Sequence, residues 1–126
     1  MGLETSRADM MQSLLEGIAL RTGEVIAAIG ELVPLKDTIS IDGGLARNGY
    51  FCGILADALE RDILVPTFTE FTALGTARMA ARGAGLEALP QPAFETKHFS
   101  PSGRVDATMR ERFGRAVQRA REWRFE

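Results

Sequence analysis

The stretch that decides the expected fold is residues 38–65, which read TISIDGGLARNGYFCGILADALERDILV. Residues 38–41 form an alternating, β-branched run that stops at the pair Gly43-Gly44, which is typical of a strand entering a tight turn. Apolar side chains then recur with helical spacing, and a second apolar run follows at 63–65. The connection between the two runs, residues 44–62, is long enough to bring the second strand back parallel to the first. The stretch predicts a strand, a glycine turn, a helix and a parallel strand.

Helices are expected on both sides of this unit. The expected segments are a long helix (1–33), the strand-turn-helix-strand unit (37–66), an alanine-rich helix (70–85), a loop (86–104) and a terminal helix (105–124). In the alanine-rich helix the small residues share one face, which lets another backbone approach closely, so we expect this helix to be tightly packed. Trp123 is expected to anchor the terminal helix by burial.

Length and composition set limits on the class of protein. The 126 residues predict one domain and exclude a two-domain enzyme with a cleft between its domains. Hydrophobic content of 45% and charged content of 25% are ordinary for a globular chain, so a real core is expected. The net charge of −2 gives no overall attraction to nucleic acid or to an acidic membrane, so neither is an expected partner.

The single cysteine and single histidine, Cys52 and His98, exclude an intrachain disulfide and a zinc tetrad. We therefore expect no metal site and a reducing compartment. No apolar run approaches the ~20 residues of a membrane helix, and the chain start lacks the plan of a signal peptide, so a cytoplasmic location is expected. Cys52 is expected to be a small packing residue, and His98 a solvated or locally bonded side chain in a loop.

The most informative local feature is the segment 42–48, DGGLARN. Two adjacent glycines let a ligand come close to the backbone, and the amides at the start of the following helix carry partial positive charge, so the turn is compatible with a nucleotide. Asp42 can contact a hydrated cation or cap the turn, and Asn48 can hydrogen-bond a purine, ribose or phosphate edge. The alternative is a plain strand-to-helix turn capped by Asp42. The arginines of the terminal helix are expected to form a solvated face.

Three ordered blocks carry a family resemblance: residues 41–48 (IDGGLARN), Pro66, and residues 70–77 (EFTALGTA). Read together they resemble the C-terminal part of FGGY-family carbohydrate kinases, and most closely the glycerol kinase group. The opening segment 15–21 and Trp123 also resemble that part of the family. The resemblance spans nearly the whole chain.

The resemblance implies an α/β fold, a partial ribonuclease-H-like domain of the actin-like ATPase type, rich in helices and with a short parallel strand pair. It implies ATP with Mg²⁺ as cofactor and transfer of the γ-phosphoryl group to a hydroxyl of a sugar or polyol. By the same resemblance Gly44 and Asn48 contact the adenosine part of the nucleotide, and Gly43 shapes the turn. The family's phosphate loop, polyol-binding residues and general base lie upstream of the matching segment, so no catalytic residue is assigned here.

Two functions remain open. The first is the C-terminal nucleotide-binding portion of an ATP-dependent carbohydrate or polyol kinase, with adenine nucleotide as its partner and no kinase activity by itself. A polyol or sugar would then be bound only through residues outside this chain. The second is a non-catalytic module for oligomerisation or partner binding, in which the apolar surface of a truncated kinase domain favours self-association.

Overall fold

The computed structural model describes residues 2–68, 70–86, 93–121 and 123. Its elements, in chain order, are α1 (Arg7–Gly30), β1 (Thr38–Ser40), the 3₁₀ helix η1 (Gly44–Arg47), α2 (Gly49–Leu59), β2 (Asp62–Pro66), α3 (Phe71–Gly83), β3 (Thr96–Phe99) and α4 (Ala107–Arg121). The expected strand, glycine turn, helix and parallel strand are therefore confirmed, with η1 as a short insertion between turn and helix.

The three strands form one mixed sheet in the order β1-β2-β3. β1 and β2 are parallel, with Ile39 opposite Ile63, and β2 and β3 are antiparallel, with Leu64 opposite His98. The expectation of a loop over 86–104 is wrong at Thr96–Phe99, because this polar run is held as a strand by the free edge of β2. His98 therefore lies on a strand and not in a loop, but its side chain is exposed as expected, with its Nε2 3.5 Å from a carboxylate oxygen of Asp62.

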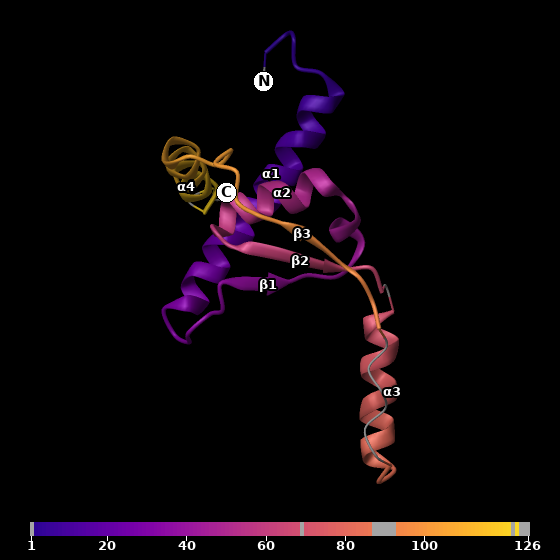
Figure 1. Cartoon of the computed structure of the whole chain (residues 1–126). Helices are drawn as coiled ribbons and strands as arrows, with labels where there is room; N and C mark the ends of the chain where they lie inside the picture. Colours follow the sequence, from indigo (N-terminus) through magenta and orange to yellow (C-terminus); the bar gives the residue numbers. More distant parts are fainter. Residues whose placement is uncertain (1, 69, 87–92, 122, 124–126) are drawn as a thin grey trace.

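Helices α1 and α2 pack against each other and cover one face of the sheet (Figure 1). The core between them holds apolar side chains of α2 and β2, with Ile63 and Cys52 fully buried; its members are Ala19, Leu20, Ala46, Phe51, Cys52, Ile54, Leu55, Ala56, Ala58, Ile63, Val65 and Val105. We call α1, α2 and the sheet the body of the chain. Burial of Cys52 confirms its expected packing role.

Glycine at position 23 allows the two helices of the body to touch. A Cβ atom there would lie 3.0 Å from the backbone oxygen of Ala58, closer than real Cβ contacts allow without a shift. The start of α1 is fixed by a capping box, in which the Ser6 side chain accepts from Asp9 N and the Asp9 carboxylate accepts from Ser6 N. Gly23 thus lets α1 lie close to α2, and the capping box fixes where α1 begins.

Helix α3 stands away from the body as an arm (Figure 1). Its base is held by a cluster of three aromatic rings, Phe68, Phe71 and Phe94, and by two hydrogen bonds from Thr67 to the backbone oxygen of Glu95. The expectation that its alanine face is tightly packed is wrong for the described residues: Ala81 is buried, whereas Ala73, Ala77, Ala80 and Ala84 are exposed. Nothing among the described residues covers that face.

Helix α4 lies beside α1 and has no buried residue. Trp123, two residues beyond its end, is 71% exposed, so the expectation that it is buried is wrong. Pro90 and Pro92 of the expected loop, and residues 122 and 124 of the expected terminal helix, lie outside the described residues. Among the described residues, no helix is long and apolar enough to cross a membrane.

Candidate functional site

The candidate site is the turn between β1 and α2, at the carboxyl end of a parallel strand. In open α/β sheets this end of the strands is where ligands bind. Ala46 anchors the turn because it is buried in the core, while Gly43, Gly44 and Asn48 lie on the exposed side. The structure therefore places all three sequence-predicted binding residues in one surface turn.

The two glycines serve different purposes. Gly43 has φ +107°, a backbone conformation that side chains rarely adopt, and its N–H donates to the Asp42 carboxylate at 2.6 Å. At Gly44 the φ is ordinary, and a Cβ atom would meet no atom within 4 Å. Space is open beside both glycines, but Gly43 is needed for the turn itself because of its positive φ, whereas glycine at position 44 is not required by the backbone.

Asn48 is the residue that starts α2. Its Oδ1 accepts from Phe51 N at 3.1 Å, which is an N-cap bond. Among the described residues, no hydrogen bond engages its Nδ2. One half of the amide therefore has a structural role, and the other half remains as a donor toward the surface.

Below the turn, the thiol of Cys52 donates to the backbone oxygen of Ala46 at 3.3 Å. Burial raises the pKa of this thiol above its ordinary value, against smaller opposing effects of a backbone hydrogen bond and of Lys97. A buried thiol with a raised pKa stays protonated at neutral pH and is a poor nucleophile. Cys52 therefore supports the floor of the turn and carries no covalent chemistry.

The arrangement offers hydrogen-bond donors to a ligand rather than a catalytic pair. The backbone N–H groups of Gly44 and Leu45 have no protein partner among the described residues, and the Asn48 Nδ2 and the exposed guanidinium of Arg47 are near them in sequence. One oxygen of the Asp42 carboxylate, Oδ1, accepts from Gly43 N. No group of three or more metal-ligating side chains occurs in the described part of the chain.

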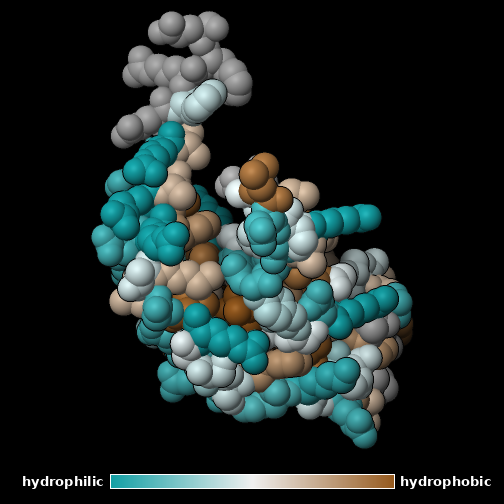
Figure 2. Space-filling view, turned by 90° about the horizontal axis from the view of Figure 1, so that it is seen from above, coloured by the Kyte–Doolittle hydropathy of each residue, from teal (hydrophilic) through white to brown (hydrophobic). Residues whose placement is uncertain are grey.

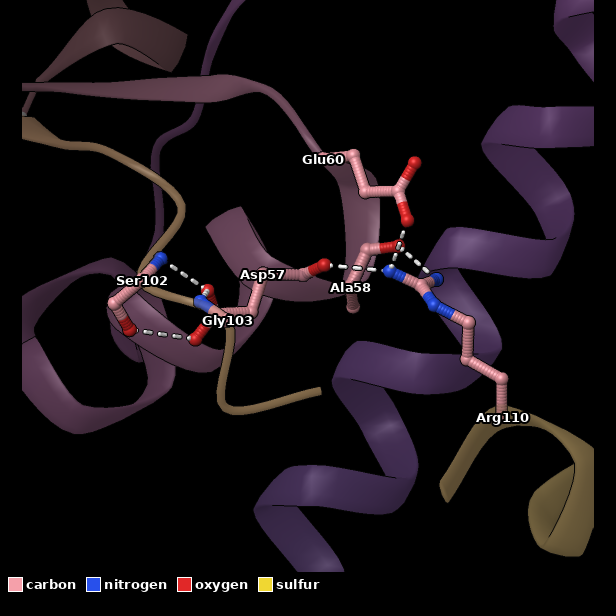
Figure 3. Close-up of polar contacts among 6 residues, drawn as sticks. All are labelled: Asp57, Ala58, Glu60, Ser102, Gly103 and Arg110. Atoms are coloured by element: carbon pink, nitrogen blue, oxygen red, sulfur yellow. Dashed lines mark hydrogen bonds and ion pairs between the residues drawn. The ribbon is translucent and has the colours of Figure 1, made fainter. Parts of the chain in front are cut away.

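The far end of α2 is fixed by a buried carboxylate. Asp57, 2% exposed, accepts hydrogen bonds from Ser102 N, from Ser102 Oγ at 3.0 Å and from Gly103 N at 2.8 Å (Figure 3). Burial by itself raises the pKa of this carboxyl, but the bonds from Ser102, Gly103 and Arg104 outweigh it and lower the pKa below 3.8. We call Asp57, Ser102 and Gly103 the Asp57 clamp.

Arg110 joins α4 to the same helix end. Its guanidinium donates to the backbone oxygens of Asp57 and Ala58, both at 2.7 Å, and pairs with Glu60 at 3.0 Å (Figure 3). These carbonyls are among the last of α2 and have no partner within the helix. The expected solvated arginine face is therefore wrong for Arg110, which is half-buried and caps α2.

Neither Asp57 nor Arg110 stands out in the sequence. Each lies about fifty residues along the chain from the residues it contacts, and no local sequence pattern predicts a contact over that separation. Together they fix the orientation of α2, whose opposite end carries the candidate turn. They are supports for the site and do not line it.

The fold and the glycine turn match one class of protein. The family model of the C-terminal domain of the FGGY family of carbohydrate kinases matches residues 1–84. The chain belongs to the FGGY family of carbohydrate kinases, as the resemblance in its sequence predicts.

The chain is similar to several glycerol kinases. The glycerol kinase of Thermus brockianus is 39% identical over 126 residues, a match that covers 94% of this chain and 25% of that protein. The glycerol kinase of Aromatoleum aromaticum is 35% identical over 131 residues, with the same two coverages. The chain thus spans about a quarter of the length of the curated relatives it matches.

Solved structures of the same class share the fold. A glycerol kinase from Plasmodium falciparum, determined with ADP, matches with a TM-score of 0.69 and 20% identity over 99% of this chain and 26% of that one. A xylulose kinase from Rhodospirillum rubrum matches with a TM-score of 0.68 and 24% identity over 95% of this chain and 25% of that one. The expected α/β kinase fold with a parallel strand pair is confirmed.

Proposed function

We propose that the chain is the C-terminal, nucleotide-binding portion of an ATP-dependent, glycerol kinase-like carbohydrate kinase, and that it has no kinase activity by itself. The observation that carries this proposal is the open turn at Gly44, where a ligand can reach the backbone without displacing a protein atom. Family membership and the similarity to glycerol kinases make an adenine nucleotide the ligand class that fits best.

The residues present fit the nucleoside end of ATP. Gly44 provides open space, the backbone N–H groups of Gly44 and Leu45 can donate hydrogen bonds, and Asn48 provides its Nδ2. When bound, ATP supplies the γ-phosphoryl group for transfer, and Mg²⁺ neutralises charge on its phosphates. The chain's own residues orient the nucleoside. Positioning of the acceptor hydroxyl and removal of its proton are assigned to the rest of a full-length kinase.

Nucleotide binding is tested with a fluorescent ADP analogue and two variants of the turn. Gly44→Val should weaken binding because it fills the open space, with little effect on folding since no atom lies within 4 Å. Asn48→Ser should also weaken binding, because serine keeps the N-cap of α2 but removes the Nδ2 donor. Gly75→Val, a matched change in the distant arm, is the control and should bind like the original chain.

Absence of activity in the isolated chain has its own test. We expect no ATP-dependent phosphorylation of glycerol or of a pentulose by the purified chain at any nucleotide concentration. Turnover above background would show that this chain contains an acceptor site and a base, and would contradict the proposal.

The binding test has its own contradicting outcome. Equal nucleotide binding by the original chain and the Gly44→Val variant would contradict the assignment of the turn.

The second candidate function is that of a non-catalytic module that associates with itself or with a partner. The observation that favours it is the apolar surface that the fold leaves open on one helix; its exposed members on α1 are Met10, Met11, Leu14, Ile18, Val25 and Ile29. Figure 2 shows apolar surface, in brown, in the middle of the face seen from above. Light scattering on the purified chain, with and without ATP, tests it: an oligomer that ignores nucleotide supports this function.

A further inference from the structure

The first turn of α2, beside the candidate site, is tied to α1 by a hydrogen bond between side chains. Tyr50 Oη donates to Glu16 Oε1 at 2.6 Å, across a separation of 34 residues in the chain. Gln12 Nε2, one helical turn earlier in α1, donates to the same oxygen at 2.7 Å. Hydrogen bonds to an ionised carboxylate are stronger than those between neutral groups. We call Gln12, Glu16 and Tyr50 the Tyr50 bridge.

The Tyr50 bridge extends the contact between α1 and α2 to the end of α2 that adjoins the site. Gly23 of α1 lies against the backbone of Ala58. Tyr50 and Ala58 are eight residues apart, which places them on one face of α2. Contact at Gly23 therefore fixes the far end of α2 on α1, and the Tyr50 bridge fixes the near end.

The start of α2 depends on contacts with other elements. Its first residue is Gly49, and glycine has the lowest helix propensity of any residue except proline. Phe51, 6% exposed, holds this turn of the helix to the core. Tyr50 holds the same turn on a second side, to α1. Contacts on two sides restrict rotation of the first turn about the helix axis, which one contact alone does not.

The side chain of Asn48 follows the orientation of this first turn. Asn48 is the N-cap of α2, and its Oδ1 accepts from Phe51 N, so the amide moves with the helix start. A hydrogen-bond donor has to meet its acceptor within a narrow range of distance and angle. A small rotation of the first turn therefore misaligns the Nδ2 donor that we assign to the nucleotide.

We propose that Tyr50 is a positioning residue of the nucleotide site: its bond to Glu16 holds the first turn of α2 so that the Asn48 Nδ2 faces the nucleotide. This inference rests on the proposed nucleotide binding. Tyr50 acts through Asn48 and needs no contact with the ligand.

The ionisation of Tyr50 reports on the bridge directly, because Tyr50 is the single tyrosine of the chain. Burial raises the pKa of its hydroxyl above its ordinary value of 10.0, and the hydrogen bond and charge of Glu16 raise it further, against smaller opposing effects of Gln12 and Arg104. The charged groups near the hydroxyl are thus Glu16 from α1 and Arg104 from the segment before α4. A tyrosinate cannot donate and repels the Glu16 carboxylate, so ionisation breaks the bridge.

Binding of the fluorescent ADP analogue to the purified 126-residue chain tests the bridge at neutral pH. Tyr50→Phe and Glu16→Ala each remove the bond, and each should weaken binding by about threefold to tenfold. Glu16→Gln keeps an acceptor for the hydroxyl and should recover most of that loss. The double variant Tyr50→Phe with Glu16→Ala should bind no more weakly than either single variant, because the two changes remove one interaction.

Two controls separate positioning from general destabilisation. Gly23→Ala loosens the same pair of helices at the other end, so it should lower the free energy of unfolding and leave ADP affinity unchanged. Glu24→Gln removes a carboxylate about two turns further along α1, where it pairs with Arg21, and should also leave affinity unchanged.

Ultraviolet titration of Tyr50 gives a readout that a purely structural role would not move. Coupling between two sites is reciprocal, so weaker ADP binding by the ionised form requires that bound ADP suppresses the ionisation. Saturating ADP should move the Tyr50 titration to higher pH, by about one pH unit for a tenfold difference in affinity. The ionised fraction is compared with and without ADP over the pH range in which circular dichroism shows the chain folded.

Three results would overturn the inference, and they differ in meaning. ADP binding that neither Tyr50→Phe nor Glu16→Ala weakens, or a Tyr50 titration that ADP leaves in place, would exclude the bridge and leave nucleotide binding standing. Equal losses of affinity in Gly23→Ala and Tyr50→Phe would show a general effect of stability. No ADP binding by the original chain would remove the proposed nucleotide function, and this inference with it.

Discussion

Helix α2 in the body and helix α3 in the arm are similar in length and are both rich in small apolar residues, but their surroundings differ. In α2 most side chains are buried, among them Phe51, Cys52 and Ile54, whereas in α3 Ala81 is the buried residue. The body is closed by contacts from segments far apart in sequence, and the arm has an aromatic base but no cover among the described residues. Helical spacing thus predicts that a helix forms, and not what packs against it.

The largest expected effect is on the contact that closes the body. Asp57→Ala leaves the amides of Ser102 and Gly103 without their acceptor and should lower the free energy of unfolding by about 3 kcal/mol. Asp37→Ala is the matched control, because Asp37 is fully exposed and holds a surface ion pair with Arg61, worth at most about 1 kcal/mol. Urea unfolding of both variants measures the difference, and equal losses would show that the Asp57 clamp does not hold the body together.

Glycine-to-alanine changes should have opposite signs in the two regions. Gly23→Ala brings a Cβ atom to 3.0 Å from a backbone oxygen of α2, so we expect a loss of about 1 kcal/mol. Gly75→Ala in α3 meets open space and should stabilise the helix by up to about 1 kcal/mol, because alanine has the higher helix propensity. Thermal unfolding followed by circular dichroism measures both. Destabilisation by Gly75→Ala would indicate that α3 is packed after all.

Acid should weaken the body through the same carboxylate. The folded-state pKa of Asp57 lies below its ordinary value of 3.8, so its stabilisation is complete above that value and is lost as pH falls through the folded-state pKa. Asp9 adds in the same direction, because the bonds from Ser6 lower its pKa as well. Unfolding free energies from about pH 7 down to about pH 2 should fall more steeply for the original chain than for Asp57→Asn. Parallel curves would exclude Asp57 as the source.

The sequence predicts those parts of the fold that depend on neighbours along the chain. The stripe of α1, the turn at Gly43 and the return of β2 all follow from local spacing, since each pattern lies within a single element or one connection. β3 was not predictable in this way, because the polar run 96–99 becomes a strand through the edge of β2. The arginines of α4 look alike in sequence, and only the position of the α2 carbonyls distinguishes Arg110.

The candidate site shows the same division. The residue types at Gly43, Gly44 and Asn48 indicate an open turn, and the structure places them together on one surface. The N-cap bond of the Asn48 Oδ1 depends on three-dimensional geometry, and so does the difference between the two glycines, which both have open space beside them but of which only Gly43 has a positive φ. The structure therefore distinguishes the backbone positions that build the turn from the open positions at which we propose that a nucleotide binds.

Nuclear magnetic resonance of the isotopically labelled chain, titrated with ADP, tests the central claim most directly. The account predicts that the backbone amides of Gly44 and Leu45 and the side-chain amide of Asn48 shift most, and that α3 and the distant Asp57 clamp stay unchanged. Gly44→Val should remove these shifts while leaving the rest of the spectrum in place. Shifts centred on another surface, or no shift at saturating ADP, would contradict the assignment of this turn as a nucleotide site.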